Sequence, residues 1–146
     1  MLAITELATT LTEHARNTDL ELAVETEPAC WRHAIDGQAA LKPDLAVRIA
    51  DADTELSWFI EIDRSTESST VLAKKLKRYD RYWRTGAEQA NRGVFPKVLW
   101  IAPTPERAEY IRLLSHDRQL NPQLFDTATP DTAVDQLTNF TESSPQ

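Results

Sequence analysis

The chain of 146 residues has 41% hydrophobic and 27% charged residues and a net charge of −7, values typical of a single soluble domain with one hydrophobic core. No stretch is long and apolar enough to predict a transmembrane helix, and the first residues lack the basic and apolar regions of a signal peptide, so we expect a cytoplasmic protein with no membrane partner. The single cysteine, Cys30, excludes an intrachain disulfide and agrees with a reducing compartment.

The spacing of apolar residues predicts a mixture of helices and strands. Apolar residues that recur every three or four positions indicate helices, whereas short runs of β-branched and aromatic residues indicate strands. In chain order, these patterns predict a helix over 3–16, strands over 21–25, 45–49 and 57–63, a helix that begins within 65–69 and ends near Gly86, a strand over 97–102 and a helix over 105–116. We expect irregular structure over 26–43, a polar loop over 87–96, and a last short strand at Leu124 and Phe125.

The order of these elements predicts an α/β domain with a mixed central sheet. One helix separates the strands at 57–63 and 97–102, so these two strands should be parallel. A short polar loop joins the strands at 45–49 and 57–63, so this pair should be antiparallel. Such a sheet buries both of its faces, and we therefore expect helices on both sides of it.

A change in composition predicts where the domain ends. Residues 127–146 contain no lysine or arginine and are rich in serine, threonine and proline, which is typical of weakly ordered chain. We therefore expect one domain over residues 1–126 and an acidic, weakly ordered tail over 127–146. One turn of helix is expected within this tail, at residues 133–137.

Positive charge is concentrated in the helix that ends near Gly86. Residues 68–86 hold six basic residues and one acid, which gives this segment a charge of +5 and leaves −12 on the rest of the chain. Such a basic segment on an acidic body can form a binding face for DNA, although a solvated helix face without a partner is the alternative. The residues expected to pack against the sheet are Leu72, Leu76 and Tyr79. The exposed residues expected to contact DNA are Lys74, Lys77, Arg78 and Arg81.

The antiparallel hairpin is expected to bring two acids together. A turn at residues 51–54 creates a register in which three apolar pairs share one face: Leu45–Ile60, Val47–Trp58 and Ile49–Leu56. In this register Asp44 faces Glu61 on the other side, and Asp63 follows on the same face as Glu61. Neighbouring carboxylates repel each other unless a proton or cation lies between them, and Mg²⁺ binds one or two carboxylates together with water and phosphate oxygens. Asp44 and Glu61 are therefore a candidate Mg²⁺ site, with ordinary surface acids as the alternative.

The same acids match the motif of a nuclease class. Pro43-Asp44, followed after sixteen residues by Glu61-Ile62-Asp63, resembles the core of PD-(D/E)XK nucleases, in which Pro-Asp opens one strand and acidic-x-Lys closes the next. The resemblance implies a restriction-endonuclease-like core. It also implies a Mg²⁺-dependent phosphodiesterase in which Asp44 and Glu61 bind the metal.

A longer segment is similar to the replication-relaxation family of plasmids and related mobile elements. The segment is FIEIDRSTESSTVLAKKLKRY, over residues 59–79. Its matching positions are Glu61, Asp63, Arg64, Thr66, Glu67, Lys75, Leu76 and Tyr79. Trp31, Pro96, the strand VLWIA and Arg107 also fall where that family has similar residues, so the resemblance covers about residues 28–115. It implies a protein that acts on DNA or on a replication protein.

Two features depart from these patterns. Asp63 stands where the nuclease motif has lysine, and the resemblance implies that Lys75 of the next helix replaces it, because Lys75 flanks the apolar stripe of that helix. Lys42 is the alternative, because the hairpin register puts it opposite Asp63. Family members often carry an N-terminal winged-helix domain, and the residues before the first predicted strand are too few for it, so we expect that domain to be absent.

Three functions remain open from the sequence. A Mg²⁺-dependent DNA endonuclease would bind the metal through Asp44 and Glu61, with Asp63 assisting and Lys75 positioning water or stabilising charge. A binding module would keep the nuclease-like fold and hold DNA or a replication protein through the basic helix. A protein-interaction or inhibitory factor would use the acidic surface. Loss of the motif lysine favours the last two functions, whereas the two acids with a lysine nearby favour the nuclease.

Overall fold

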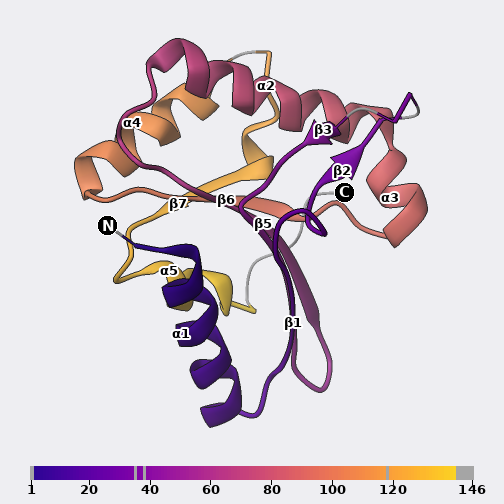
Figure 1. The fold of residues 1–146 in the computed structure, drawn as a ribbon, viewed down its shortest axis with the longest axis vertical. Helices are drawn as coiled ribbons and strands as arrows, with labels where there is room; N and C mark the ends of the chain where they lie inside the picture. Colours follow the sequence, from indigo (N-terminus) through magenta and orange to yellow (C-terminus); the bar gives the residue numbers. More distant parts are fainter. Residues whose placement is uncertain (1, 35, 38, 118, 141–146) are drawn as a thin grey trace.

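The computed structural model describes residues 2–34, 36–37, 39–117 and 119–140, which form a mixed α/β domain (Figure 1). The elements are α1 (Ile4–Asn17), β1 (Glu21–Glu25), β2 (Arg32–His33), β3 (Ala39–Leu41), β4 (Leu45–Ala50), β5 (Glu55–Ile62), α2 (Ser69–Thr85), α3 (Ala87–Arg92), β6 (Lys97–Ile101), α4 (Pro105–Ser115), the 3₁₀ helix η1 (Pro122–Leu124), β7 (Phe125–Ala128) and α5 (Ala133–Leu137). Within these residues, no helix combines the length and apolar character needed to cross a membrane.

The main sheet has five strands in the order β1-β4-β5-β6-β7. β1, β4 and β5 are antiparallel neighbours, whereas β5, β6 and β7 are parallel. Both predicted relationships, the antiparallel hairpin and the parallel crossover, are therefore confirmed. The predicted hairpin register is also confirmed, because Leu45 pairs with Ile60, Val47 with Trp58 and Ile49 with Leu56.

Helices cover the two faces of the sheet and create two hydrophobic layers (Figure 1). On one face, Leu7 and Leu11 of α1 pack with the apolar side of the β4–β5 hairpin. On the other face, Leu72 and Leu76 of α2 pack with Phe59 of β5, and α4 covers the neighbouring part of the sheet. Side chains along β4 and β5 point alternately into one hydrophobic layer and the other, and nearly every residue of β5 is therefore buried.

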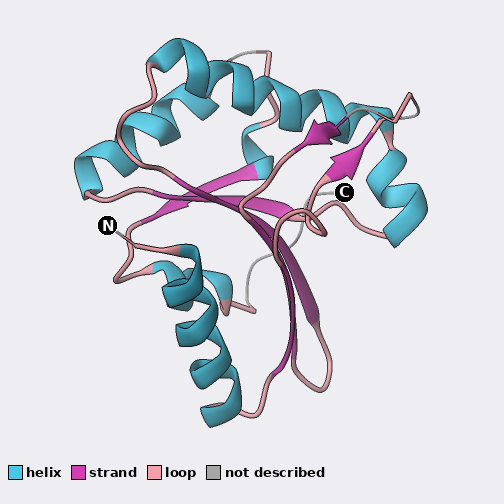
Figure 2. Cartoon of the chain, in the orientation of Figure 1, coloured by secondary structure: helices cyan, strands magenta, loops and turns pink. Residues whose placement is uncertain are grey.

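Two segments contain more regular structure than the sequence predicted. The loop expected over 87–96 includes the helix α3, which lies between Gly86 and Gly93. Both glycines have a left-handed conformation, with φ of 73° at Gly86 and 85° at Gly93. Gly86 therefore ends α2, and Gly93 ends α3. The region expected to be irregular, over 26–43, contains β2 and β3, which pair as a separate two-stranded sheet beside α2 (Figure 2).

The C-terminal segment belongs to the same core. The expected domain boundary at residue 127 falls inside β7, and the helical turn expected at 133–137 is α5. Leu137 of α5 is fully buried against the face that α1 covers, and Trp58 Nε1 donates a hydrogen bond of 3.1 Å to its carbonyl oxygen. The rest of the expected tail, residues 141–146, lies outside the described residues.

Candidate functional site

Asp44 lies at the point where the hairpin ladder ends. Its backbone N–H donates to the carbonyl oxygen of Ile60 at 2.9 Å, and its Oδ2 accepts from the N–H of Ile62 at 2.7 Å. Asp44 is therefore bound to the two residues that flank Glu61 in β5. This arrangement holds its carboxylate at the same end of the hairpin as the Glu61 carboxyl.

Glu61 is a buried acid beneath α2, with only 6% of its surface exposed. The Tyr79 hydroxyl of α2 donates to Glu61 Oε2 at 2.8 Å, and Lys75 Nζ lies 3.9 Å from Oε1. Burial and then the charge of Asp44 raise the pKa of Glu61 from 4.5 to about 8, against the opposing effects of Lys75 and Tyr79. The carboxyl therefore holds its proton at neutral pH unless a further cation approaches.

Lys75 connects Glu61 to a second acid, Glu67. Lys75 Nζ lies 2.6 Å from Glu67 Oε1, which is much closer than its distance to Glu61. Burial lowers the pKa of Lys75, but the hydrogen bond with Glu67 and the charges of Glu61 and Glu67 outweigh it, so the pKa is raised and Lys75 stays protonated. Of the two lysines considered from the sequence, Lys75 lies beside Glu61, whereas the exposed Lys42 lies over the Trp31 ring at 4.8 Å from its centroid. We call Asp44, Glu61 and Lys75 the acid–lysine cluster.

Asp63 has a different environment from Asp44 and Glu61. Arg107 of α4 binds both of its oxygens, through Nε at 2.8 Å and Nη2 at 3.1 Å, and the Asp63 side chain is fully buried. Arg107 Nη2 also donates to the backbone carbonyl of Glu67 at 3.0 Å. Asp63 therefore anchors α4 and the loop before α2, and its oxygens are engaged by arginine rather than presented to a metal.

The residues around Glu61 could supply only a few of the ligands that a metal ion needs. In the part of the chain that the structure describes, no group of three or more His, Cys, Asp or Glu residues is arranged to hold an ion. Asp44 and Glu61 remain as two carboxylates, the number with which Mg²⁺ can bind when water and phosphate supply its other ligands. The adjacent Glu67 Oε2 is also buried and has no hydrogen-bond partner.

The exposed side of α2 is strongly basic. The packing predicted from the sequence is confirmed, because Leu72, Leu76 and Tyr79 are buried. The exposed cations on the other side are Lys74, Lys77, Arg78 and Arg81. These four residues, the basic face of α2, form no ion pair with any other described residue, whereas the nearby Arg84 pairs with Asp80 at 2.6 Å.

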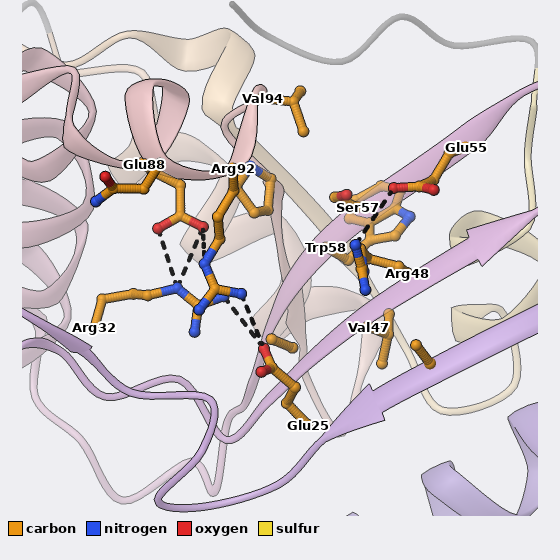
Figure 3. Close-up of a pocket in the computed structure, with 14 residues that line it drawn as sticks. Glu25, Arg32, Val47, Arg48, Glu55, Ser57, Trp58, Glu88, Arg92 and Val94 are labelled. Atoms are coloured by element: carbon orange, nitrogen blue, oxygen red, sulfur yellow. Dashed lines mark hydrogen bonds and ion pairs between the residues drawn. The ribbon is translucent and has the colours of Figure 1, made fainter.

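A second charged cluster was not predicted from the sequence. Arg32 is buried beneath α3, where its Nε lies 3.0 and 3.2 Å from the two oxygens of Glu88. Figure 3 shows Glu25 and Arg92 converging on the same pair beside a pocket of about 290 Å³. Two arginines thus neutralise two glutamates and tie α3 to β1 and β2. Arg32 and Glu88 are 56 positions apart, so no local spacing could have revealed the pair.

These features define the chain as a mixed α/β domain with a buried acid–lysine cluster under one helix and a basic face on its outer side. The chain belongs to the replication-relaxation family, whose model matches residues 1–98. The match includes the whole acid–lysine cluster and the basic face of α2, and it ends within β6, before Arg107. The family indicates a role in the replication of plasmids or other mobile elements. A comparison with curated proteins finds no match.

Proposed function

We propose that this domain binds DNA during the replication of a plasmid or other mobile element, and that the basic face of α2 makes the contact. The observation that carries the proposal is a row of four exposed cations that form no ion pair with any other residue the structure describes, on a protein with a net charge of −7. Their positions follow the spacing i, i+3, i+4 and i+7, so all four lie on one side of the helix.

Electrostatic attraction explains why these four cations would bind DNA, and why the DNA would bind at α2. Lysine and arginine side chains neutralise phosphates and release condensed counterions, which supplies most of the sequence-independent affinity for DNA. The remainder of the chain carries a large negative charge and repels the phosphate backbone, so binding is directed to α2. The buried stripe of α2 holds the helix against the sheet, and the row of charges is therefore presented on a rigid support.

The test is a titration of fluorescein-labelled DNA followed by anisotropy at increasing salt concentration. Combining Lys74→Glu, Lys77→Glu and Arg81→Glu should abolish binding, because three attractive contacts become repulsive. Lys77→Glu alone should reduce the slope of log affinity against log salt by about 1, since one phosphate contact is lost. Arg16→Glu is the matched control, because it changes the charge equally on α1, across the sheet. Salt-independent binding that survives the triple change would exclude DNA contact by α2 and leave a replication protein as the partner to test.

The acid–lysine cluster supports a second candidate, a Mg²⁺-dependent nuclease with the PD-(D/E)XK pattern. Asp44 and Glu61 would hold the ion, which would polarise the phosphodiester and acidify a bound water. Tyr79 fixes the orientation of Glu61, and the protonated Lys75 would place a positive charge beside the scissile phosphate. Asp63 has no direct part in this arrangement, because Arg107 engages both of its oxygens.

Cleavage and metal binding can be tested separately. Supercoiled and linear DNA would be incubated with Mg²⁺ or Mn²⁺, and Mn²⁺ binding would be measured by calorimetry. Asp44→Asn should remove both cleavage and metal binding, whereas Lys75→Ala should remove cleavage and keep metal binding. Arg16→Ala, on α1 and outside both the acid–lysine cluster and the basic face, is the control for loss of a cation. A wild-type protein that neither cuts DNA nor binds Mn²⁺ would eliminate the nuclease and leave the DNA-binding proposal standing.

A further inference from the structure

A groove runs along the inner edge of the basic face of α2. It has a volume of about 830 Å³ and lies between the second half of α2, the helix α3 and the β2–β3 segment. Arg78 and Arg81 line it from α2, His33 lines it from β2, and Asn91 lines it from α3. We call it the α2–α3 groove.

The lining combines cations with flat, weakly polar surfaces. Arg78 and Arg81 are exposed and form no ion pair with another described residue. His33 adds an exposed imidazole ring, the largely buried Tyr82 contributes only a small part of its surface, and the remaining surface includes three alanines, which leave room for planar groups. Asp36 is the one acidic residue among the described lining, so the two arginines give this part of the surface a positive balance.

From this lining we infer that the nucleic acid bound at α2 is single-stranded, and that its bases enter the α2–α3 groove while its phosphates contact Arg78 and Arg81. The inference rests on the proposed DNA-binding function and specifies its ligand. Proteins that bind single strands combine basic residues along the backbone path with aromatic rings and guanidinium planes on which bases stack. The α2–α3 groove offers both kinds of surface side by side.

The size of the groove argues for single strands. A volume of about 830 Å³ is that of a small-molecule pocket, large enough for one or a few nucleobases. Bases of a duplex are stacked and paired inside the helix, so a duplex would meet only the outer row of cations through its phosphates. The pocket in Figure 3 offers no such site, because its arginines Arg32, Arg48 and Arg92 are already paired with glutamates that also line it.

Neighbouring residues provide matched pairs of variants for the test. Arg78 and Lys77 are both exposed on α2, but only Arg78 lines the groove, so Arg78→Glu and Lys77→Glu make the same charge change at two different places. Asn91 and Ala90 form the same kind of pair on α3, because both are exposed and only Asn91 lines the groove. Asn91→Glu and Ala90→Glu each add one negative charge.

The assay compares one fluorescein-labelled oligodeoxynucleotide as a single strand and annealed to its complement. The wild type should bind the single strand more tightly than the duplex. Arg78→Glu should weaken single-strand binding about ten-fold more than Lys77→Glu, because only Arg78 borders the groove that the bases enter, while both changes weaken duplex binding alike. Asn91→Glu should weaken single-strand binding, and Ala90→Glu should leave it unchanged. Thermal melting of each variant checks that the fold is intact.

Two results would overturn the inference, and only the second would also refute the proposed DNA-binding function. Equal affinity for the two forms of DNA, with equal effects within each pair of variants, would refute the groove as a base-binding site while the DNA-binding proposal stands. Absence of binding to either form would refute the proposed function, and the inference would fall with it.

Discussion

Replacing Glu61 with glutamine should stabilise the protein at neutral and alkaline pH. Burial, followed by the charge of Asp44, raises the pKa of Glu61 from 4.5 to about 8, so the folded protein holds this proton more tightly than the unfolded chain does. Linkage between protonation and folding then fixes the sign of the effect. The stabilising contribution is fully present below pH 4.5 and is lost as the pH rises through about 8.

The magnitude follows from the size of the pKa change. One pKa unit corresponds to about 1.4 kcal/mol, so the difference between 4.5 and about 8 corresponds to about 5 kcal/mol of unfolding free energy. Glutamine has almost the same volume as glutamate, and its amide oxygen can still accept the hydrogen bond from Tyr79. Glu61→Gln should therefore match the wild type at acidic pH and exceed it by several kcal/mol above pH 8.

Urea denaturation across this pH range measures the difference directly. The wild type should lose stability as the pH rises, and the Glu61→Gln protein should lose much less. Glu13→Gln is the matched control, because it makes the same change at an exposed carboxylate of α1 and should leave stability unaltered. If Glu61→Gln were less stable than the wild type at pH 8, the carboxylate would be ionised and compensated in the folded state, and the reasoning would be refuted.

Two further changes test the ion pair at the end of β5 and the C-terminal helix. Arg107→Met should cost about 3–5 kcal/mol of unfolding free energy in urea denaturation, because it leaves the fully buried Asp63 carboxylate without its partner. Arg112→Met on the same helix should have little effect, because its pair with Glu109 is exposed, and equal losses for the two variants would contradict the buried pair. Leu137→Ala should cost about 2–5 kcal/mol because Leu137 is fully buried, and an unchanged midpoint would mean that α5 contributes nothing to the domain.

Features with a local pattern could be predicted from the sequence. Alternating apolar residues determined the register of the β4–β5 hairpin, because a slip by one residue would have exchanged both faces. The 3.6-residue stripe in α2 likewise separated its buried residues from its basic face. The short helix α3 escaped prediction, because its sequence AEQANR has no apolar stripe and its one fully buried side chain is the charged Glu88.

Interactions between distant positions could not be predicted in the same way. Asp63 and Arg107 are 44 positions apart, so their pairing depends on how α4 packs against the end of β5. The choice between Lys42 and Lys75 also required the tertiary structure, since chain spacing allowed both. Lys42 lies over Trp31, whereas Lys75 lies between Glu61 and Glu67.

The packing of α5 on the hairpin has a consequence for the protein while it is being synthesised. Trp58 finds its hydrogen-bond partner, the carbonyl of Leu137, 79 positions later in the chain. Before β7 and α5 have left the ribosome, the growing chain lacks β7 beside β6, and the apolar face of the hairpin lacks the part of its cover that α5 supplies. A strand edge and an apolar face exposed together favour association with other nascent chains. Translation pauses before α5 has left the ribosome would therefore lengthen the period in which this domain is most prone to aggregate.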